Sequence, residues 1–383
     1  MKKFLAILLA MLMALCAVSA CAEAVNPDDI EDNMTSADGK YVVAFVTDVG
    51  QLKDKSFNQG TWNGVKAYAS ANSLSYKYYQ PANGDQATDD DRYDAMKAAV
   101  DGGAQVVVCA GFMQEAALRK AAAEFADVKF IFIDGYPIDL DNVAPISFKE
   151  EQSGFLAGYA VVKEGFTKLG FTGGGAGTNP ACCRFGYGFA QGVNAAAKEM
   201  DINVELKYSW EYGSSFQAST ELQTMISGWY ESGTEIVFAC GGSIYSSAGE
   251  AAAKVNGKVI GVDTDQSGII DGKYGEGMTV TSAMKGLYPA TYDTLTDVVV
   301  NGNWDKYVGQ IATLGLISGT DPEANYVQIP MTTQFEDGKF TADDYKALVA
   351  AMFDGSLTVS NDISKIASDF ATVITLDDQG SIK

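Results

Sequence analysis

The chain has 383 residues, 47% of them hydrophobic, and carries 49 acidic against 27 basic residues for a formal net charge of −22. This length can supply two packed domains, and so strong a negative charge argues against nucleic acid and other polyanions as partners. The chain contains no histidine, which removes the most common general base and metal ligand and argues against hydrolase or metalloenzyme chemistry.

The first twenty residues have the pattern of a secretion signal, because a short basic head is followed by an apolar run and then by small residues. The segment ends in VSAC, which resembles a bacterial lipobox. We therefore predict a lipoprotein signal peptide at residues 1–20 and a lipid anchor on Cys21. The alternative is ordinary signal cleavage near AVSA with an incidental cysteine. A lipid anchor would hold the protein at the outer face of the bacterial cell membrane without a spanning helix.

Residues 21–39 follow the signal and are acidic, aperiodic and rich in turn formers. Such a composition buries too little apolar surface to offset the entropy lost on ordering. We interpret this stretch as an acidic tether.

From residue 40 the chain alternates apolar strand patterns with amphipathic helix patterns. The predicted strands are residues 41–46, 75–80, 104–110, 129–134, 144–148, 168–174, 204–210, 234–240, 258–263 and 278–283. The predicted helices are residues 57–71, 88–101, 113–126, 150–165, 185–200, 215–231 and 244–254. This alternation predicts an α/β fold with parallel sheets covered on both faces. The pattern weakens after residue 310, where we expect a hairpin or strand, one helix and a short final strand.

So many strands predict two lobes and not one sheet. The segment KEEQSGFLAGYAVVKEGF, residues 149–166, is interpreted as the first crossover between them. The expected N-terminal lobe comprises residues 40–165 plus 276–308. The expected C-terminal lobe comprises residues 166–275 plus 309–383.

Acids stand at the carboxyl ends of three predicted strands. Asp48 follows YVVAFVT, Asp134 ends KFIFID and Asp263 ends KVIGVD. Ligands of open parallel sheets bind outside these ends, so acids from both lobes predict a cleft lined with hydrogen-bonding groups. Each acid alone could instead be a helix cap or a turn former.

Two aromatic residues, a glycine and a lysine occupy similar positions. Phe57 starts a predicted helix, where its ring can point into the cleft instead of the core. Trp210 follows a strand and is either a cleft ring or a hydrophobic plug. Gly241 allows a tight turn, with ligand contact as a further role. Lys285 comes directly after a buried strand, which favours the cleft over the surface.

The remaining motifs predict no chemistry. TGGGAGT, residues 172–178, lacks the Lys-Ser/Thr of a nucleotide-hydrolysing loop and is interpreted as a strand-to-helix turn. Cys109 and Cys240 are expected to be buried thiols, Cys182 and Cys183 are neighbours, and no disulfide or metal framework is evident. Without histidine no nucleophile–base pair stands out, so we expect no catalytic residue, metal or cofactor.

Four motifs resemble those of one known family. They are TDVGQLKDKSFNQGTWNGV (47–65), GFLAGYAV (154–161), GVDTDQ (261–266) and TSAMKG (281–286). They resemble the basic membrane protein (BMP) family, the substrate-binding lipoproteins of ABC importers, whose best understood branch comprises purine nucleoside receptors. The resemblance implies a type I periplasmic-binding-protein fold, in which two Rossmann-like lobes joined by three crossovers close on the ligand.

The resemblance also implies an aromatic clamp. In the nucleoside branch two rings sandwich the base, one at the position of Phe57 and the other near Trp210. Trp210 stands where phenylalanine is common, and the segments ACCRFGYGF (181–189) and YGSSFQAS (212–219) differ from those receptors.

The polar site residues are implied in the same way. Asn58 and Asp48 match groups that face the base and the cleft. Asp263 and Lys285 match the acid and the lysine that bind the ribose hydroxyls, and Asp134 matches another cleft acid. A carboxylate can accept two hydrogen bonds from a vicinal diol, and a nearby lysine keeps it ionised.

We therefore predict an extracytoplasmic, lipid-anchored solute-binding protein of an ABC importer that binds a purine nucleoside, is a monomer and is not an enzyme. Its expected partners are the small-molecule ligand, the ABC permease subunits and the membrane, with no nucleic acid. Open alternatives are another ligand, such as a flavin-type vitamin or a furanose signal, a nucleoside-processing enzyme, and a sensor or adhesin with the same fold.

Overall fold

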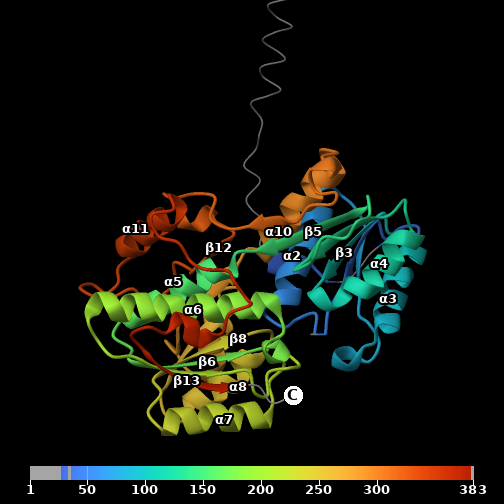
Figure 1. Ribbon diagram of the computed structural model, residues 1–383. Helices are drawn as coiled ribbons and strands as arrows, with labels where there is room; N and C mark the ends of the chain where they lie inside the picture. The colour runs from blue at the N-terminus through green and yellow to red at the C-terminus, as the bar shows by residue number, and fades with distance from the viewer. Residues whose placement is uncertain (1–26, 33–35, 50, 381–383) are drawn as a thin grey trace, which may run out of the picture.

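The computed structural model describes residues 27–32, 36–49 and 51–380, which form two α/β lobes lying side by side (Figure 1). The predicted signal and Cys21 lie outside the described residues. Among the helices that are described, none combines the length and the apolar composition needed to span a bilayer.

The first lobe is built on a six-stranded parallel sheet with the strand order β11-β5-β4-β3-β1-β2. Its strands are β1 (Val43–Val46), β2 (Tyr76–Tyr79), β3 (Val106–Ala110), β4 (Lys129–Ile133), β5 (Val143–Phe148) and β11 (Ala312–Leu314). Its helices are α2 (Phe57–Ala71) and α10 (Leu287–Leu295) on one face, and α3 (Asp89–Asp101) and α4 (Glu115–Glu124) on the other.

Strand β1 shows why both faces are covered. Val43 and Phe45 pack under α2, whereas Ala44 and Val46 pack toward α3 and α4. Successive side chains of a strand point to opposite faces, so a strand apolar throughout must be buried on both.

The second lobe contains a seven-stranded sheet with the order β12-β10-β9-β8-β6-β7-β13, parallel except for β12. Its strands are β6 (Lys168–Gly173), β7 (Glu205–Ser209), β8 (Ile236–Cys240), β9 (Lys258–Asp263), β10 (Thr279–Lys285), β12 (Val327–Gln328) and β13 (Thr375–Gly380). Its helices are α5 (Glu150–Lys163), α6 (Pro180–Met200) and α11 (Ala342–Phe353) on one side, and α7 (Thr220–Glu231), α8 (Ile244–Ala253) and α9 (Ser267–Tyr274) on the other (Figure 1).

Helices α5 and α6 lie backbone to backbone because glycines line their contact. A Cβ added to Gly154 of α5 would lie 2.2 Å from the carbonyl oxygen of Phe185. A Cβ added to Gly192 of α6 would lie 2.1 Å from the carbonyl oxygen of Phe155. No side chain fits at such distances, so the glycines set the separation of the two helices.

The predicted elements are present, but the predicted lobe boundaries are wrong at three places. Helix α5 packs against α6 in the second lobe, so the first crossover is confined to Lys149, before the helix, and does not extend over residues 150–166. Strand β10 pairs with β9 and belongs to the second sheet, although residues 276–308 are predicted in the N-terminal lobe. Strand β11 pairs with β5 in the first sheet, although residues 309–383 are predicted in the other lobe.

The chain therefore crosses between the lobes three times, before α5, after β10 and between β11 and β12. Hydrogen bonds tie these crossings together, from Lys149 N to the carbonyl oxygen of Leu314 (2.8 Å) and from Gly286 N to that of Tyr326 (2.6 Å). These two bonds join the three crossing segments into a single connection between the lobes.

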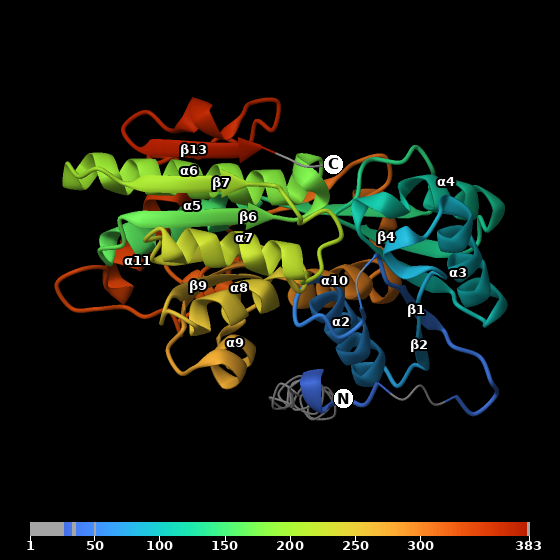
Figure 2. The ribbon, with the colours of Figure 1, turned by 90° about the horizontal axis from the view of Figure 1, so that it is seen from below.

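Part of the predicted tether is docked on the first lobe. Residues 27–32, which include the short helix η1 (Pro27–Asp29), pack beside α2, as Figure 2 shows near the label N. Specific side-chain bonds, described below, hold this segment, so the sequence interpretation of a free tether over residues 21–39 is wrong for it.

A candidate ligand cleft between the lobes

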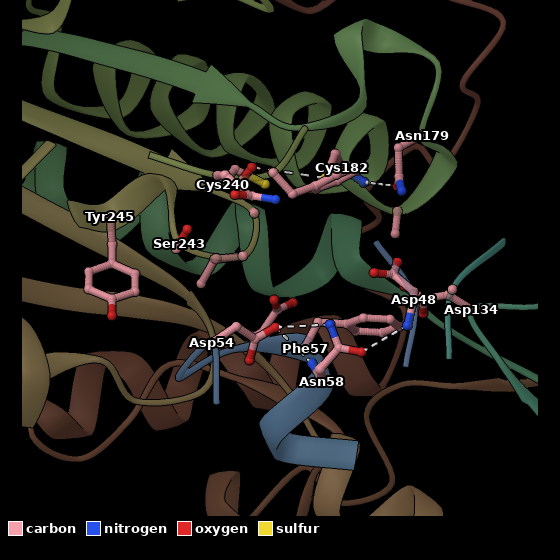
Figure 3. A pocket seen from close by; sticks show the side chains of 18 of the residues that line it. Asp48, Asp54, Phe57, Asn58, Asp134, Asn179, Cys182, Cys240, Ser243 and Tyr245 are labelled. Carbon is pink, nitrogen blue, oxygen red and sulfur yellow. Dashed lines mark hydrogen bonds between the residues drawn. The ribbon is translucent and has the colours of Figure 1, made fainter. Parts of the chain in front are cut away.

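A cavity with about 950 Å³ of empty space, including its opening to solvent, lies between the carboxyl ends of the two sheets. Figure 3 shows residues of the first lobe, such as Phe57 and Asn58, facing second-lobe residues such as Asn179 and Ser243 across it. Of the eight predicted ligand-binding residues, seven line this cavity: Asp48, Phe57, Asn58, Asp134, Gly241, Asp263 and Lys285.

The start of α2 is organised by Asp54, which the sequence reasoning missed. Its buried carboxylate accepts hydrogen bonds from the backbone N–H groups of Ser56 (2.9 Å), Asn58 (2.9 Å) and Gln59 (3.1 Å). These are donors that a helix start leaves unpaired. The Asp-x-Ser-Phe-Asn spacing is the sequence signal that could have indicated it.

Ser56 occupies the N-cap position, but its side chain makes no capping bond. Its hydroxyl instead donates to Asp263 Oδ2 at 2.5 Å. Because Ser56 belongs to the first lobe and Asp263 ends β9 of the second, this bond joins the two lobes at the cavity wall.

Asn58 fastens the end of β1 to the start of α2. Its Oδ1 accepts from Asp48 N (3.1 Å), and its Nδ2 donates to Asp54 Oδ2 (3.2 Å). Asp48 lies so close to Gly111 that a Cβ there would be 2.4 Å from Asp48 Oδ2, and Gly111 has a φ of +91° that favours glycine. The amide of Asn58 thus positions the strand end.

Lys285 is the centre of a buried charge cluster. Its ammonium lies 2.5 Å from Asp134 Oδ2, 3.6 Å from Glu150 Oε1 and 3.8 Å from Asp263 Oδ1. Arg184 also binds Glu150, at 2.6 Å. The cluster therefore joins the end of β4 in the first lobe to β9, β10 and α5 of the second.

These carboxylates and the ammonium affect one another's protonation. Burial raises the pKa of Asp134 to about 6, although the positive charge of Lys285 acts in the opposite direction. Burial also raises the pKa of Asp263. Burial by itself would lower the pKa of Lys285, but the carboxylates of Asp134, Asp263 and Glu150 outweigh it and raise that pKa, so the lysine remains a cation.

Two acids of this cluster lie at the ends of strands, and both have an unusual backbone conformation. Asp134 has a φ of +55° and Asp263 a φ of +65°. Aspartate tolerates this left-handed region better than most residues, and such strain is concentrated at functional sites. In addition, Asp134 Oδ1 is buried with no hydrogen-bond partner among the described residues. It can accept a hydrogen bond from a ligand.

Phe57 presents a half-buried ring to the cavity beside this cluster. The Lys285 ammonium lies 4.7 Å from the centre of the ring. An aromatic face and charged hydrogen-bonding groups therefore lie close enough together in the cleft for one small ligand to contact both.

Trp210, the eighth predicted residue, does not line the cavity. Its ring is buried edge-on against Phe171 (5.2 Å between centroids) and Tyr208 (5.6 Å). Trp210 and Tyr208 are two residues apart and point to the same face of the sheet, which here is the core. Trp210 is the hydrophobic plug that was the alternative.

Phe216 is one of three second-lobe aromatic residues that line the cavity among the described residues, together with Phe185 and Tyr245. It lies in YGSSFQAS, between β7 and α7, and has a φ of +59°, an outlier for an aromatic residue. Glycines make room for it, since a Cβ on Gly174 would lie 2.2 Å from Phe216 Cδ1 and one on Gly241 would lie 3.1 Å from it. Gly241 thus supports the ring as well as lining the cavity.

The glycine-rich turn and the burial of Cys109 and Cys240 agree with their sequence interpretations. TGGGAGT leads from β6 through the short helix η4 (Gly175–Gly177) into α6 as a strand-to-helix turn. Cys109, Cys182, Cys183 and Cys240 are buried free thiols. In the part of the chain that the structure describes, no cluster of acids and cysteines has a metal-binding arrangement.

Comparison with known proteins gives consistent likenesses. A family model described as Bmp, ABC transporter substrate-binding protein PnrA-like, matches residues 41–321. The chain is 29% identical to the CD4+ T-cell-stimulating antigen of Listeria monocytogenes, over 77% of this chain and 84% of that protein. It is 28% identical to the ABC transporter nucleoside-binding protein BmpA of Lactococcus lactis, over 60% of this chain and 65% of that protein.

Two solved structures resemble the whole fold. The solute-binding protein of an ABC transporter system from Aeropyrum pernix has a TM-score of 0.62 at 21% identity, over 86% of this chain and 90% of that one. Its counterpart from Conexibacter woesei has a TM-score of 0.61 at 19% identity, over 84% and 99%. At these identities the likeness shows the fold, which is the predicted type I fold of periplasmic solute-binding proteins.

Proposed function

Because this chain belongs to the Bmp family of ABC transporter substrate-binding proteins, we propose that its cleft binds a purine nucleoside. The family's proteins capture a small molecule outside the cytoplasm for a membrane permease. The observation that carries the proposal is the ring of Phe57 beside the cluster of Lys285, Asp134 and Asp263. A nucleoside needs a flat apolar surface for its base and charged hydrogen-bonding groups for its sugar.

In this proposal the base stacks between Phe57 of the first lobe and Phe216 of the second. Both rings line the cavity, and stacking on aromatic side chains accepts different bases at about 1–3 kcal/mol per base. Phe216 takes the role that the sequence assigned to the region of Trp210. Asp48 and Asn58 lie next to Phe57 and would face the polar edge of the base.

The ribose would lie over the charge cluster. Asp134 Oδ1 has a free acceptor position, Asp263 can accept from a second hydroxyl, and Lys285 donates to a sugar oxygen. Because these groups come from both lobes, a bound nucleoside would favour the closed arrangement. Gly241 would contribute backbone contacts at the opposite wall.

We also propose that the chain is a monomeric lipoprotein anchored through Cys21 to the outer face of the cell membrane, where it meets its ABC permease. The support is the lipobox-like VSAC sequence. Replacing Cys21 with alanine should release the protein from the membrane fraction into the medium. Equal membrane retention of both forms would reject the anchor.

The ligand can be identified directly. Protein purified from its host should release a purine nucleoside on denaturation, detectable by mass spectrometry. Release of a flavin or a furanose compound in equal molar amount would overturn the nucleoside assignment and leave the binding function intact. Nucleoside incubated with the protein should be recovered unchanged, because we propose no catalysis; conversion to free base would show an enzyme.

A further inference from the structure

Specific contacts hold the N-terminal segment, residues 27–32, to the first lobe, and a flexible linker would not make them. Helix η1 (Pro27–Asp29) lies beside α2 (Figure 2), and Asp32 bonds to Trp62 and Lys66 of that helix. The OH of Tyr76 donates to the carbonyl oxygen of Glu31 at 2.7 Å, which adds a contact to β2.

Asp32 is the main attachment point. Its Oδ1 accepts from Trp62 Nε1 at 2.8 Å and from Lys66 Nζ at 3.0 Å. Its Oδ2 lies 2.6 Å from Lys53 Nζ. Lys66 Nζ donates further to the carbonyl oxygen of Ile30, at 2.9 Å.

Two of the three partners of Asp32, Trp62 and Lys66, are themselves buried, whereas Lys53 is exposed. Trp62 is 1% exposed and Lys66 is 3% exposed. Among the described residues, the hydrogen bonds of the Trp62 indole N–H and the Lys66 ammonium go to the N-terminal segment. With the segment docked, Lys66 is a buried cation, and removing the Asp32 carboxylate alone would leave that cation without its partner, which is strongly destabilising.

The protonation of Asp32 agrees with this arrangement. Partial burial acts to raise its pKa, but the hydrogen bonds from Lys53, Lys66 and Trp62 outweigh it and hold the pKa at about 2. The carboxylate is therefore ionised at any physiological pH.

We infer that residues 27–32 are an integral structural part of the first lobe. We further infer that their docking on α2 orients the α2 side of this lobe toward the membrane. The second half of the inference rests on the lipid anchor proposed above. Only residues 22–26 would then separate the anchored Cys21 from the docked segment. Fully extended, that stretch reaches roughly 20 Å. The first lobe would be held close to the bilayer, while the second lobe remains free to move on the crossovers.

The charges on this surface are mixed. The segment carries Asp28, Asp29, Glu31 and Asp32, and the hollow beside Asp32 is lined by Lys53, Lys55 and Lys66, of which Lys53 and Lys66 pair with Asp32. The short distance between the anchor and the docked segment, and not surface charge, therefore sets the orientation.

The docking is tested on the chain that starts at residue 22. Replacing Asp32 with alanine should lower the melting temperature by at least about 5 °C and speed amide hydrogen exchange at residues 27–32. Glu31→Ala is the matched control, because Glu31 contacts the lobe through its carbonyl oxygen, and it should change neither. The double variant Asp32→Ala/Lys66→Met should recover at least half of the lost stability, since it removes the unpaired charge. Equal melting temperatures and exchange for Asp32→Ala and wild type, or no recovery in the double variant, would overturn the inference.

The orientation is tested with acylated protein on vesicles of phosphatidylcholine and phosphatidylglycerol. A donor dye on Ser70→Cys, one turn beyond Lys66, should transfer energy to a bilayer acceptor more efficiently than one on Lys97→Cys of α3. Asp32→Ala should reduce that difference. Equal transfer from both positions would reject the orientation. The ligand affinity of every variant should equal that of wild type, so this outcome is independent of the nucleoside proposal.

Discussion

Phe216 and Trp210 show how a single residue can be misassigned from sequence. Trp210 lies one residue beyond β7, so its position indicates a cleft contact, but strand alternation turns its ring into the core. Phe216 lies in an irregular loop, where no periodicity reports the direction of a side chain. Its left-handed backbone and the glycines around it are visible only in the folded chain.

The two residues should therefore respond differently to substitution. Phe216→Ala should raise the nucleoside Kd by about 5- to 150-fold, the equivalent of about 1–3 kcal/mol of stacking, with little change in unfolding. Trp210→Ala should lower the free energy of unfolding by about 3–5 kcal/mol, because it leaves a cavity against Phe171. Calorimetry and chemical denaturation measure the two quantities. The reverse pattern would place the second ring at Trp210.

Asp54 predicts a pH dependence. Burial raises its pKa to about 7, against the lowering effect of three backbone hydrogen bonds. The folded state then binds a proton that the unfolded chain releases near pH 4, so Asp54 contributes less to stability as pH rises from about 4 to 7, by at most about 1.4 kcal/mol per pH unit.

The comparison with Asp54→Asn isolates this effect. The free energy of unfolding of wild type minus that of the variant should fall as pH rises from about 4 to 7 and be constant above that range. Urea denaturation at a series of pH values gives both terms. A difference that does not vary with pH would mean that Asp54 has an ordinary pKa in the folded protein.

The polar site residues could be predicted because of where strands end. Asp48, Asp134 and Asp263 follow apolar strands whose carboxyl ends meet at the cleft, and the structure places all three there. Asp54 and Glu150 could not be predicted in the same way. Asp54 lies in a loop, and Glu150 begins α5, where an acid is equally expected as a favourable charge at a helix N-terminus.

For helices and strands, sequence patterns predict the type of each element better than its place in the fold. The predicted helix 57–71 has the bounds of α2, because a polar loop precedes it and apolar residues such as Trp62, Val65 and Ala69 recur along it at helical spacing. The patterns do not predict α9, a short helix that contains Gly268 and Gly272. Nor do they assign β10 to a lobe, because that depends on its pairing with β9, a contact between strands that no local pattern reports.

The glycine contact between α5 and α6 should be sensitive to a single methyl group. Gly192→Ala would place a Cβ 2.1 Å from the carbonyl oxygen of Phe155 and should lower the free energy of unfolding by about 1–3 kcal/mol. The matched control is Gly228→Ala in α7, where no atom of another described part of the chain lies within 4 Å of an added Cβ. It should leave stability unchanged or raise it by up to about 1 kcal/mol. Equal effects in thermal denaturation would show that the two helices can separate at low cost.

At the scale of the whole molecule, the connection between the lobes decides how a ligand acts. The three crossovers hydrogen-bond to one another on one side, and Lys285 and Ser56 join the lobes within the cavity. A molecule that contacts Phe57 in one lobe and Asp263 in the other adds interactions only when the lobes are closed. Its binding free energy therefore shifts the population toward the closed form.

The most direct measurement is titration calorimetry of the ligand-free protein with adenosine, guanosine and inosine. We expect saturable 1:1 binding of at least one of them, weakened about 5- to 150-fold by Phe57→Ala, the equivalent of about 1–3 kcal/mol. Phe353→Ala, which changes an exposed ring on α11, should bind as wild type does. Absence of binding to all three nucleosides, or an unchanged affinity in Phe57→Ala, would rule out a nucleoside stacked on Phe57 in this cleft.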